Sequence, residues 1–244
     1  MDETLRKLDV QGKLYSTKES FNYSAYLYRY RYKVVREHIA GPKLLEVGIG
    51  YGDFTKWLSR ERNFSVVSID GSLTNINRAK RKCDTGHVTF EHCLFEDFKS
   101  NRKFDDILIT NTLEHVNDPI GILLHIKKFL KKSGRIHITV PNAMSLHRQL
   151  GKEMGMLEYE WSLNEHDIEV GHRRVYTPEL LKEHVRYAGL RVTAKDGIIL
   201  KSLSNSQMND IVNTYGPQVM EGFFRLGRKY PDLSAELYLC CTHI

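Results

Sequence analysis

The sequence predicts an α/β fold in which helices cover both faces of a mostly parallel sheet. Short apolar runs typical of strands alternate with amphipathic segments typical of helices over most of the 244 residues. A glycine-rich turn follows the first strand-like run, and an aspartate ends the second. Because parallel strands need long crossover connections, usually helices, this alternation favours a series of right-handed βαβ units in one domain.

The predicted elements begin with a helical segment that runs from Tyr15 to Ile39 and stops at Gly41-Pro42. The strand-like runs that follow are Lys43–Val47, Ser65–Asp70, Val88–Glu91, Asp105–Thr110, Arg135–Val140, one that starts at Arg191, and Ala235–Cys241. The helical segments between them are Phe54–Arg60, Leu73–Lys82, Ile120–Leu130 and Pro178–Ala188. Their order predicts a layered domain with a sheet between two sets of helices.

Two stretches interrupt this alternation. Residues 142–176 follow the fifth predicted strand without a clear period, and residues 201–232 are similarly irregular. Ligands bind outside the carboxyl ends of the strands in open α/β sheets, so we expect residues 142–176 to form a lid or acceptor insertion. The predicted single domain then consists of a helical N-terminal cap (1–40), a ligand-binding core (41–141), this insertion (142–176) and the last part of the sheet (177–244).

Composition and charge narrow the class of protein. Hydrophobic residues make up 41% of the chain, and no apolar run approaches the ~20 residues that a membrane-spanning helix needs. The segment from Met1 to Lys7 carries acids and lacks the apolar stretch of a secretory signal, so we expect a cytoplasmic location. The four cysteines include no C-x-x-C pair, which argues against a disulfide framework or a zinc site. The net charge of +6 suits an anionic partner but is spread along the chain.

The glycine-rich turn reads Glu46-Val47-Gly48-Ile49-Gly50-Tyr51-Gly52 and lies between a predicted strand and a predicted helix. Glycines at such a place let the backbone turn sharply and approach a ligand closely. The spacing is G-x-G-x-G, whereas dinucleotide-binding turns have G-x-G-x-x-G. The carboxylate of Glu46 would repel a pyrophosphate, but it would attract a ligand that carries an amino group and a sulfonium.

This run resembles the E-x-G-x-G-x-G motif of the class I S-adenosylmethionine-dependent methyltransferases. Three further features agree: Asp70 ends the second strand eighteen residues after Gly52, Leu94-Phe95-Glu96-Asp97-Phe98 follows the third strand, and the fourth runs into Leu113-Glu114-His115-Val116. The run Gly171–Leu181 is similar to the small-molecule branch, which includes ubiquinone-type, sugar and natural-product methyltransferases. The resemblance covers roughly residues 40–200 and implies a Rossmann-like, seven-stranded sheet.

The resemblance also implies that S-adenosylmethionine is the cofactor and S-adenosylhomocysteine the product. In this family the acid at the position of Asp70 binds both ribose hydroxyls; the alternative is that it only caps the next helix. The acid that many relatives place after the third strand corresponds to Leu94, so the adenine contact shifts to the Phe95 backbone and Glu96. The implied cofactor contacts are Glu46, Gly48, Gly50, Gly52, Asp70, Gly71, Phe95, Glu96, Asn111 and Leu113.

The implied reaction is an in-line attack of an acceptor oxygen or nitrogen on the sulfonium methyl group. We expect a small-molecule acceptor, such as a sugar, a cell-surface glycan precursor or a natural-product intermediate. A hydroxyl acceptor must lose its proton, and His115 and His172 are the candidate bases because histidine titrates near neutrality. The alternatives are that His115 only packs at the start of a helix and that His172 belongs to a loop.

The predicted acceptor contacts are Tyr26, Tyr30, His166, Arg173 and Arg174. The two arginines suit an anionic acceptor, which they would hold through paired hydrogen bonds, or else they lie in a solvated loop. The two tyrosines line the acceptor pocket or form a buried helical face. The acids and histidines of residues 165–172 match no common metal-ligand spacing, so no metal is expected.

Two other functions compete with small-molecule methylation. Methylation of RNA or protein is favoured by four cations that interleave with tyrosines and could track phosphates, namely Arg29, Arg31, Lys33 and Arg36. Nucleic acid is disfavoured because the fourth strand ends in Asn111-Thr112-Leu113-Glu114, not in the N-P-P-Y of adenine-N6 enzymes. A non-catalytic S-adenosylmethionine-binding protein would be expected to have a damaged glycine turn, whereas this turn keeps its glutamate and glycines. A homodimer is one option for assembly.

Overall fold

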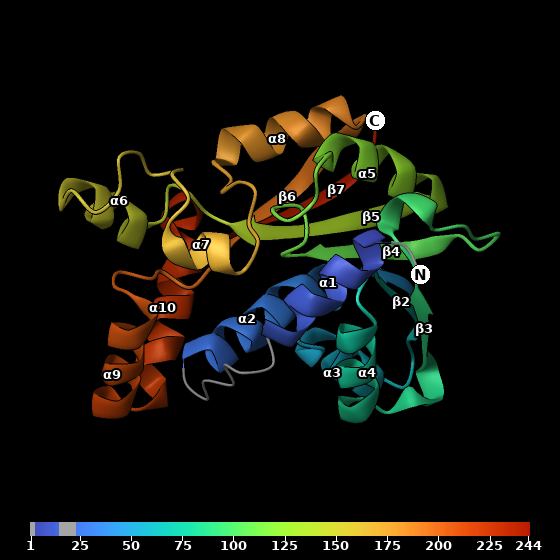
Figure 1. Cartoon of the computed structure of the whole chain (residues 1–244), viewed down its shortest axis with the longest axis horizontal. Helices are drawn as coiled ribbons and strands as arrows, with labels where there is room; N and C mark the ends of the chain where they lie inside the picture. The colour runs from blue at the N-terminus through green and yellow to red at the C-terminus, as the bar shows by residue number, and fades with distance from the viewer. Residues whose placement is uncertain (1–2, 15–22) are drawn as a thin grey trace.

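A computed structural model describes residues 3–14 and 23–244, and this part of the chain contains a seven-stranded sheet (Figure 1). The strand order is β3-β2-β1-β4-β5-β7-β6, in which β7 runs antiparallel to both neighbours and the other pairs are parallel. The predicted mostly parallel, Rossmann-like sheet is therefore confirmed. The strands are β1 (Lys43–Val47), β2 (Ser65–Asp70), β3 (Val88–His92), β4 (Phe104–Thr110), β5 (Leu130–Pro141), β6 (Leu190–Ile198) and β7 (Glu236–His243).

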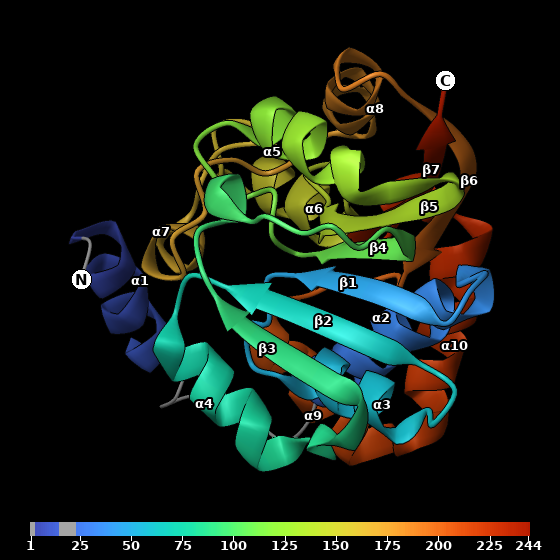
Figure 2. The same ribbon diagram turned by 90° about the vertical axis from the view of Figure 1, so that its right-hand side faces the viewer.

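Helices pack on both faces of the sheet (Figures 1 and 2). One apolar core lies between the sheet and α5 and α8, and a second lies between the sheet and α2, α3, α9 and α10. The helices are α1 (Glu3–Leu14), α2 (Tyr23–His38), α3 (Asp53–Arg60), α4 (Leu73–Lys82), α5 (Pro119–Ile126), α6 (Leu146–Glu153), α7 (Glu165–Glu169), α8 (Pro178–Tyr187), α9 (Asn205–Tyr215) and α10 (Pro217–Lys229). Of the helices that the structure describes, none is long and apolar enough to cross a membrane.

Strand β1 lies at the centre of the parallel part because its side chains are apolar toward both helix layers. Leu44 faces the core under α2 and α3, while Leu45 and Val47 face the core under α5 and α8. Such strands, buried on both faces, are typical of parallel sheets. Because β1 pairs in parallel with both β2 and β4, the three strands end at one edge, and Gly48, Asp70 and Asn111 meet there.

The stretch 201–232, which the sequence predicts to be irregular, forms the helices α9 and α10. Ser204 and Gln207 make a reciprocal capping box at the start of α9, and Gly216, with a φ of 74°, separates the two helices. Both helices pack against α2 in the second core. The prediction of irregular structure was wrong. In α9 only Met208 and Val212 are buried, too few to give a clear helical period, whereas α10 is amphipathic and its period was missed.

The N-terminal cap consists of α1 and α2; residues 15–22, where the predicted helical segment begins, lie outside the described residues. Figure 2 shows α1 beyond the tips of β1, β2 and β3, next to α4. There the Asp9 carboxylate accepts hydrogen bonds from the Ser72 hydroxyl and the Thr74 backbone, both at 3.0 Å. The cap therefore covers one face of the sheet with α2 and part of its carboxyl edge with α1.

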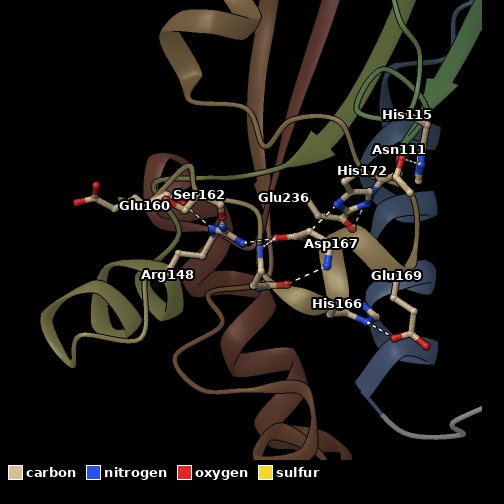
Figure 3. Close-up of polar contacts among 12 residues, drawn as sticks. Asn111, His115, Arg148, Glu160, Ser162, His166, Asp167, Glu169, His172 and Glu236 are labelled. Atoms are coloured by element: carbon tan, nitrogen blue, oxygen red, sulfur yellow. Dashed lines mark hydrogen bonds and ion pairs between the residues drawn. The ribbon is translucent and has the colours of Figure 1, made fainter. Parts of the chain in front are cut away.

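Residues 142–176 carry α6 and α7, which Arg148 joins at the end of β5 (Figure 3). The Arg148 guanidinium is buried and donates to Asp167 Oδ2 at 3.0 Å and to the Glu160 carbonyl at 2.6 Å. Asn164 and Asp167 form a capping box at the start of α7. The segment therefore has a defined structure of its own, although its sequence shows no clear period.

A buried ion pair fastens the cap to the sheet. Arg31 of α2 and Glu236 of β7 are 8% and 3% exposed, and the guanidinium donates to both carboxylate oxygens, at 2.8 Å between Nε and Oε2. The Asn111 amide, which follows β4, donates to the same carboxylate at 2.9 Å. Removal of either charged partner would leave the other buried and uncompensated.

We expect Arg31→Met to lower the free energy of unfolding by about 3–5 kcal/mol, because it leaves the Glu236 carboxylate buried without its counter-charge. Urea unfolding followed by circular dichroism measures this change. Arg29→Met, an exposed position on the same helix, is the control and should change stability by less than about 0.5 kcal/mol. The double variant Arg31→Met/Glu236→Met should regain part of the loss; equal losses in Arg29→Met and Arg31→Met would contradict the expectation.

Candidate functional site

The glycine loop between β1 and α3 has a left-handed backbone at each of its three glycines. The φ angles of Gly48, Gly50 and Gly52 are 87°, 53° and 78°. A Cβ on Gly48 would lie 2.4 Å from Thr112 Oγ1, and one on Gly52 would lie 2.8 Å from the Ala79 Cα, whereas one on Gly50 would meet nothing within 4 Å. Packing within the protein thus requires Gly48 and Gly52, while Gly50 borders open space at the carboxyl edge of the sheet.

Asp70, at the end of β2, holds this loop in place. Its Oδ2 accepts from the backbone N–H of Ile49 at 2.7 Å and of Gly50 at 3.4 Å, and its Oδ1 accepts from the Ser72 backbone at 2.7 Å. Burial raises the pKa of Asp70 against the lowering effect of these hydrogen bonds. The side chain that caps α4 is Ser72, so Asp70 is not the N-cap of α4. The predicted ribose contact of Asp70 stays a prediction.

Glu46 lies beneath the loop and is fully buried. Its carboxylate accepts hydrogen bonds from the hydroxyls of Thr55 in α3, at 2.9 and 3.0 Å, and of Ser68 in β2, at 2.6 Å. Burial raises the pKa of Glu46 to about 7, although the Ser68 and Thr55 hydrogen bonds lower it. Glu46 therefore ties α3 to the sheet, in addition to the electrostatic role that the sequence predicts for it.

The edge beyond β2 and β3 is lined by apolar side chains. A Cβ on Gly71 would lie 2.5 Å from Leu8 of α1 and 3.5 Å from Leu94, so both leucines lie close to this glycine. Phe95 begins a short 3-10 turn and is partly buried, while Glu96 is exposed. This edge can take the flat, apolar part of a ligand, as predicted for adenine. The sequence did not reveal the contribution of α1, because helix contacts across the sheet edge leave no local pattern.

The aromatic side chain of α2 that faces the glycine loop is Tyr28, whose ring lies 5.8 Å from that of Tyr51. The two predicted tyrosines lie elsewhere. Tyr30 stacks on Phe224 of α10 with 4.3 Å between ring centroids, and Tyr26 stacks on Tyr30. Tyr30 is thus buried between α2 and α10, and Tyr26 is partly buried beside it; a contact of either with the acceptor stays a prediction. A helix turn of 3.6 residues puts Tyr28 on the side of the glycine loop.

Asn111, in the segment after β4, links the strands β5 and β7 through hydrogen bonds of its side chain. Asn111 has a φ of 48°, and its amide oxygen accepts from the Thr139 hydroxyl at 2.7 Å while its amide nitrogen donates to Glu236. The Leu113 side chain is fully buried in the core beneath α5. Contacts of Asn111 and Leu113 with a cofactor, as predicted, would therefore come from their backbone.

Three side chains with metal-binding or proton-accepting chemistry meet beside this segment. One carboxylate oxygen of Glu114 and one ring nitrogen each of His115 and His172 lie within 4.8 Å of one another. We name these three residues the EHH cluster. The two imidazole rings lie 4.8 Å apart at an angle of 69° (Figure 3). The backbone fixes the arrangement, since the Arg173 N–H donates to the Glu114 carbonyl at 2.8 Å and His115 Nδ1 lies 3.3 Å from the Gly171 carbonyl.

The electrostatics of the EHH cluster reflect its burial. Burial raises the pKa of Glu114 to about 7, which His172 and Arg31 partly oppose. Burial and the neighbouring His172 lower the pKa of His115 to about 3, so its ring is neutral near pH 7. A group with so low a pKa is a weak proton acceptor but keeps a lone pair for a ligand.

Asp167 of α7 orients His172 (Figure 3). Its Oδ1 lies 3.0 Å from His172 Nδ1, and its Oδ2 accepts from Arg148 and from the Asn164 backbone. Burial opposes ionisation, but the hydrogen bonds from His172 and Asn164 and the charge of Arg148 lower the pKa of Asp167 to about 2. The ionised carboxylate thus fixes the ring of His172 and leaves its Nε2 for other contacts.

Of the remaining predicted acceptor contacts, Arg173 and Arg174 lie beside the EHH cluster and bind backbone carbonyls near it. The Arg174 guanidinium donates to the carbonyls of Leu113 and Val116 at 2.8 and 2.6 Å, and Arg173 Nε donates to the His115 carbonyl at 3.0 Å. These contacts hold the turn after β4, and an acceptor contact of the two arginines stays a prediction. His166 is exposed and lies 3.8 Å from Glu169 on α7 (Figure 3).

A second group of polar side chains, which the sequence did not reveal, comes from the start of α2, the start of α6 and the segment between β6 and α9. Among the residues that the structure describes, the buried Tyr23 hydroxyl, Ser145 hydroxyl and His147 Nδ1 have no hydrogen-bond partner. The Lys201 ammonium lies 5.6 Å from the Tyr23 ring centroid, and burial and the charge of Arg148 lower its pKa to about 8. We name Tyr23, Ser145, His147 and Lys201 the polar wall. Because interiors normally satisfy polar groups, such atoms suit a polar ligand.

Comparison with known protein families identifies the chain. The sequence profile of the family described as "Methyltransferase domain" matches residues 23–195, which include the glycine loop, Asp70 and the EHH cluster. The chain belongs to this family. The methyltransferase predicted from the glycine run is thereby confirmed at the level of family.

Named relatives and solved structures agree with this assignment. A ubiquinone biosynthesis O-methyltransferase of Rhodopseudomonas palustris (strain BisB5) is 25% identical over 175 residues, 68% of this chain and 65% of that protein. A protein of the same name from Pelagibacter ubique is 35% identical over 102 residues, 41% of this chain and 42% of that protein. These matches span less than two thirds of either relative.

Among solved structures, the N-methyltransferase NodS from Bradyrhizobium japonicum, in complex with S-adenosylhomocysteine, has a TM-score of 0.59 at 14% identity. The likeness covers 99% of both chains. At this level of identity it concerns the fold, which is shared along the whole methyltransferase chain.

Gly50→Ala should weaken binding of S-adenosylmethionine at least tenfold, because the new Cβ points into the open space that we expect the cofactor to fill. Isothermal titration calorimetry measures the affinity. Gly155→Ala is a matched control, since Gly155 also has a left-handed φ, 71°, and nothing within 4 Å of its Cβ position. Both variants should lose roughly 1 kcal/mol of stability from the strained backbone. Unchanged affinity in Gly50→Ala would show that the cofactor does not border this glycine.

Glu46→Gln should stabilise the protein more at pH 8 than at pH 5. The pKa of Glu46 is about 7 in the folded protein and near its ordinary 4.5 in the unfolded chain, so the native state binds the extra proton and stability falls as the pH rises from 4.5 to 7. The neutral amide removes this loss, and the difference between the two pH values should be about 2 kcal/mol.

Urea unfolding at both pH values checks this prediction for Glu46. Glu61→Gln is a control of opposite sign, because the Arg36 hydrogen bond lowers the pKa of Glu61 and its ionised form stabilises the fold. A gain for Glu46→Gln that is the same at pH 5 and pH 8 would mean that this carboxyl does not titrate between them.

Proposed function

We propose that this methyltransferase transfers the methyl group of S-adenosylmethionine to a hydroxyl oxygen of a small, polar acceptor, and that the acceptor binds between the EHH cluster and the polar wall. The observation that carries the proposal is the set of buried polar atoms, on Tyr23, Glu114 and His147, that have no hydrogen-bond partner among the residues that the structure describes. Such atoms favour an acceptor with several hydrogen-bonding groups. Sugars, glycan precursors and natural-product intermediates with hydroxyl groups all meet this description.

Methyl transfer depends more on the position of the acceptor oxygen than on a strong acid or base. The acceptor oxygen attacks the methyl carbon, an O–C bond forms as the S–C bond breaks, the electron pair of that bond stays on the sulfur of S-adenosylhomocysteine, and the hydroxyl proton passes to solvent. The sulfonium already activates the methyl group, so holding the oxygen ~3 Å from the carbon on the S–C axis supplies much of the rate. The EHH cluster lies at the carboxyl end of β4, next to the glycine loop after β1, and His115 and His172 are our candidates for contact with the acceptor hydroxyl.

An anionic acceptor is supported by Lys201. Within the described part of the chain its buried ammonium forms no ion pair; Arg148 repels it, while Asp167 and Glu236 attract it. A carboxylate or phosphate on the acceptor would stabilise this charge. Lys201 takes this role in our proposal in place of Arg173 and Arg174, whose guanidiniums bind backbone carbonyls.

RNA as the acceptor is the second candidate, and the structure weakens the observation that favoured it. Of the four cations on α2, Arg31 is buried against Glu236 and Arg36 pairs with Glu61 at 2.9 Å. Two of the four charges are thus used within the protein, which leaves a poor surface for tracking phosphates. Relatives named ubiquinone biosynthesis O-methyltransferases, which act on a small molecule by their name, also favour the first candidate.

The test measures S-adenosylhomocysteine by mass spectrometry after incubation with S-adenosylmethionine and a panel of acceptors. The panel contains dihydroxybenzoate, its uncharged methyl ester, a sugar and a short RNA. We expect product above the acceptor-free background with a hydroxylated small molecule, and more with the acid than with the ester. Methylation of the RNA alone, or binding of NAD in place of S-adenosylmethionine by calorimetry, would overturn the proposal.

A further inference from the structure

The EHH cluster has the donor set of a metal site. Its members come from two segments, Glu114-His115 after β4 and His172 after α7, and offer two imidazole nitrogens and one carboxylate oxygen within 4.8 Å of one another. Imidazole together with carboxylate suits divalent first-row metals such as Mn²⁺, Co²⁺ and Zn²⁺. Three protein ligands leave coordination positions for ligands that are not protein.

The burial of Glu114 is a second, independent observation. This side chain is 0% exposed, and apart from the residue's own backbone N–H its carboxylate oxygens have no hydrogen-bond partner in the described part of the chain. Other buried carboxylates here are satisfied: Glu46 by two hydroxyls and Glu236 by Arg31 and Asn111. A buried acid without partners is costly unless a cation or a hydrogen-bond donor compensates it.

The two histidines are oriented as metal ligands are. A metal-binding histidine usually donates its other N–H to a carboxylate or a carbonyl, which fixes the ring. His172 Nδ1 lies 3.0 Å from the Asp167 carboxylate, and His115 Nδ1 lies 3.3 Å from the Gly171 carbonyl. With the Nδ1 atom of each ring engaged in this way, Nε2 is the nitrogen that remains for a ligand. Arg148 in turn holds Asp167, so the support extends into α6 (Figure 3).

We propose that Glu114, His115 and His172 bind one divalent first-row cation, and that the acceptor hydroxyl reaches this cation when it lies beside the methyl group. The inference rests on the methyltransferase function proposed above and narrows its acceptor. A cation with open positions prefers an acceptor with two neighbouring oxygens, such as a catechol or a vicinal diol. It would also lower the pKa of the bound hydroxyl, whose proton then passes to solvent before the oxygen attacks the methyl carbon. The two histidines then serve as ligands and not as bases.

The sequence expectation of no metal considered the acids and histidines of residues 165–172. In the structure, that segment supplies only His172 to the cluster, while His166 lies apart on the exposed side of α7 (Figure 3). Glu114 and His115 belong to a different part of the chain. No local spacing rule can therefore detect this set of ligands.

The test titrates Mn²⁺ into chelator-treated protein without an affinity tag and follows the free ion by electron paramagnetic resonance. We expect one tight site per chain, with affinity at least tenfold weaker in His172→Gln and in Glu114→Gln. His166→Gln is the matched control and should bind Mn²⁺ as the wild type does, since His166 is also a histidine near an acid on the same segment. Mn²⁺ should raise the midpoint of thermal unfolding of the wild type and of His166→Gln, but not of His172→Gln.

Binding of S-adenosylmethionine, measured by calorimetry on the same samples, separates this proposal from the proposed function. Mn²⁺ binding that is absent, or equal in wild type and His172→Gln, overturns the metal site while the methyltransferase function stands if the cofactor still binds. If the wild type does not bind S-adenosylmethionine, the proposed methyltransferase function is overturned, and the Mn²⁺ titration still decides the metal site. If Glu114→Gln fails to fold by circular dichroism, His172→Gln, which is less buried, decides the result.

Discussion

The buried ion pair between Arg31 and Glu236 is the interaction on which the arrangement of the site depends. It fixes the cap helix α2 against the antiparallel strand β7, and through Asn111 it reaches the end of β4. Coulombic effects of Arg31 or Glu236 also reach Tyr23, Glu114 and Lys201, so the pair contributes to the electrostatics of both the EHH cluster and the polar wall. Movement of α2 away from the sheet would separate the two charges and leave Glu236 without its counter-charge, which costs free energy.

Three further buried carboxylates hold the glycine loop, helix α3 and His172 in place. Asp70 accepts the backbone N–H groups of the glycine loop, Glu46 ties α3 to β2 beneath that loop, and Asp167 fixes His172. These hydrogen bonds fix the glycine loop and His172 before a ligand binds, so less conformational entropy is lost on binding. Among the described residues, the buried polar groups that lack a hydrogen-bond partner include Glu114, Tyr23 and His147, which belong to the EHH cluster and the polar wall where we propose that the acceptor binds.

Much of the fold and of the cofactor end could be predicted from the sequence, because their signals are local. Strands β1 and β2 begin and end at the residues where apolar runs predicted them, and the glycine loop lies at the predicted turn. The acceptor end could not be predicted in the same way. Helix α9 buries few residues, and Tyr28 differs from Tyr26 and Tyr30 only by its direction on the helix.

The sequence by itself determined the parallel sheet and the methyltransferase family of the glycine loop, because strand period and glycine spacing act over a few neighbouring residues. Only the tertiary structure decided that Glu114, His115 and His172 meet and that, within the described residues, no side chain hydrogen-bonds the Glu114 carboxylate. It also decided that Arg31 and Arg174 are used within the protein. The physical reason is that a side chain's partners, burial and charge state depend on packing between segments that are far apart in the chain.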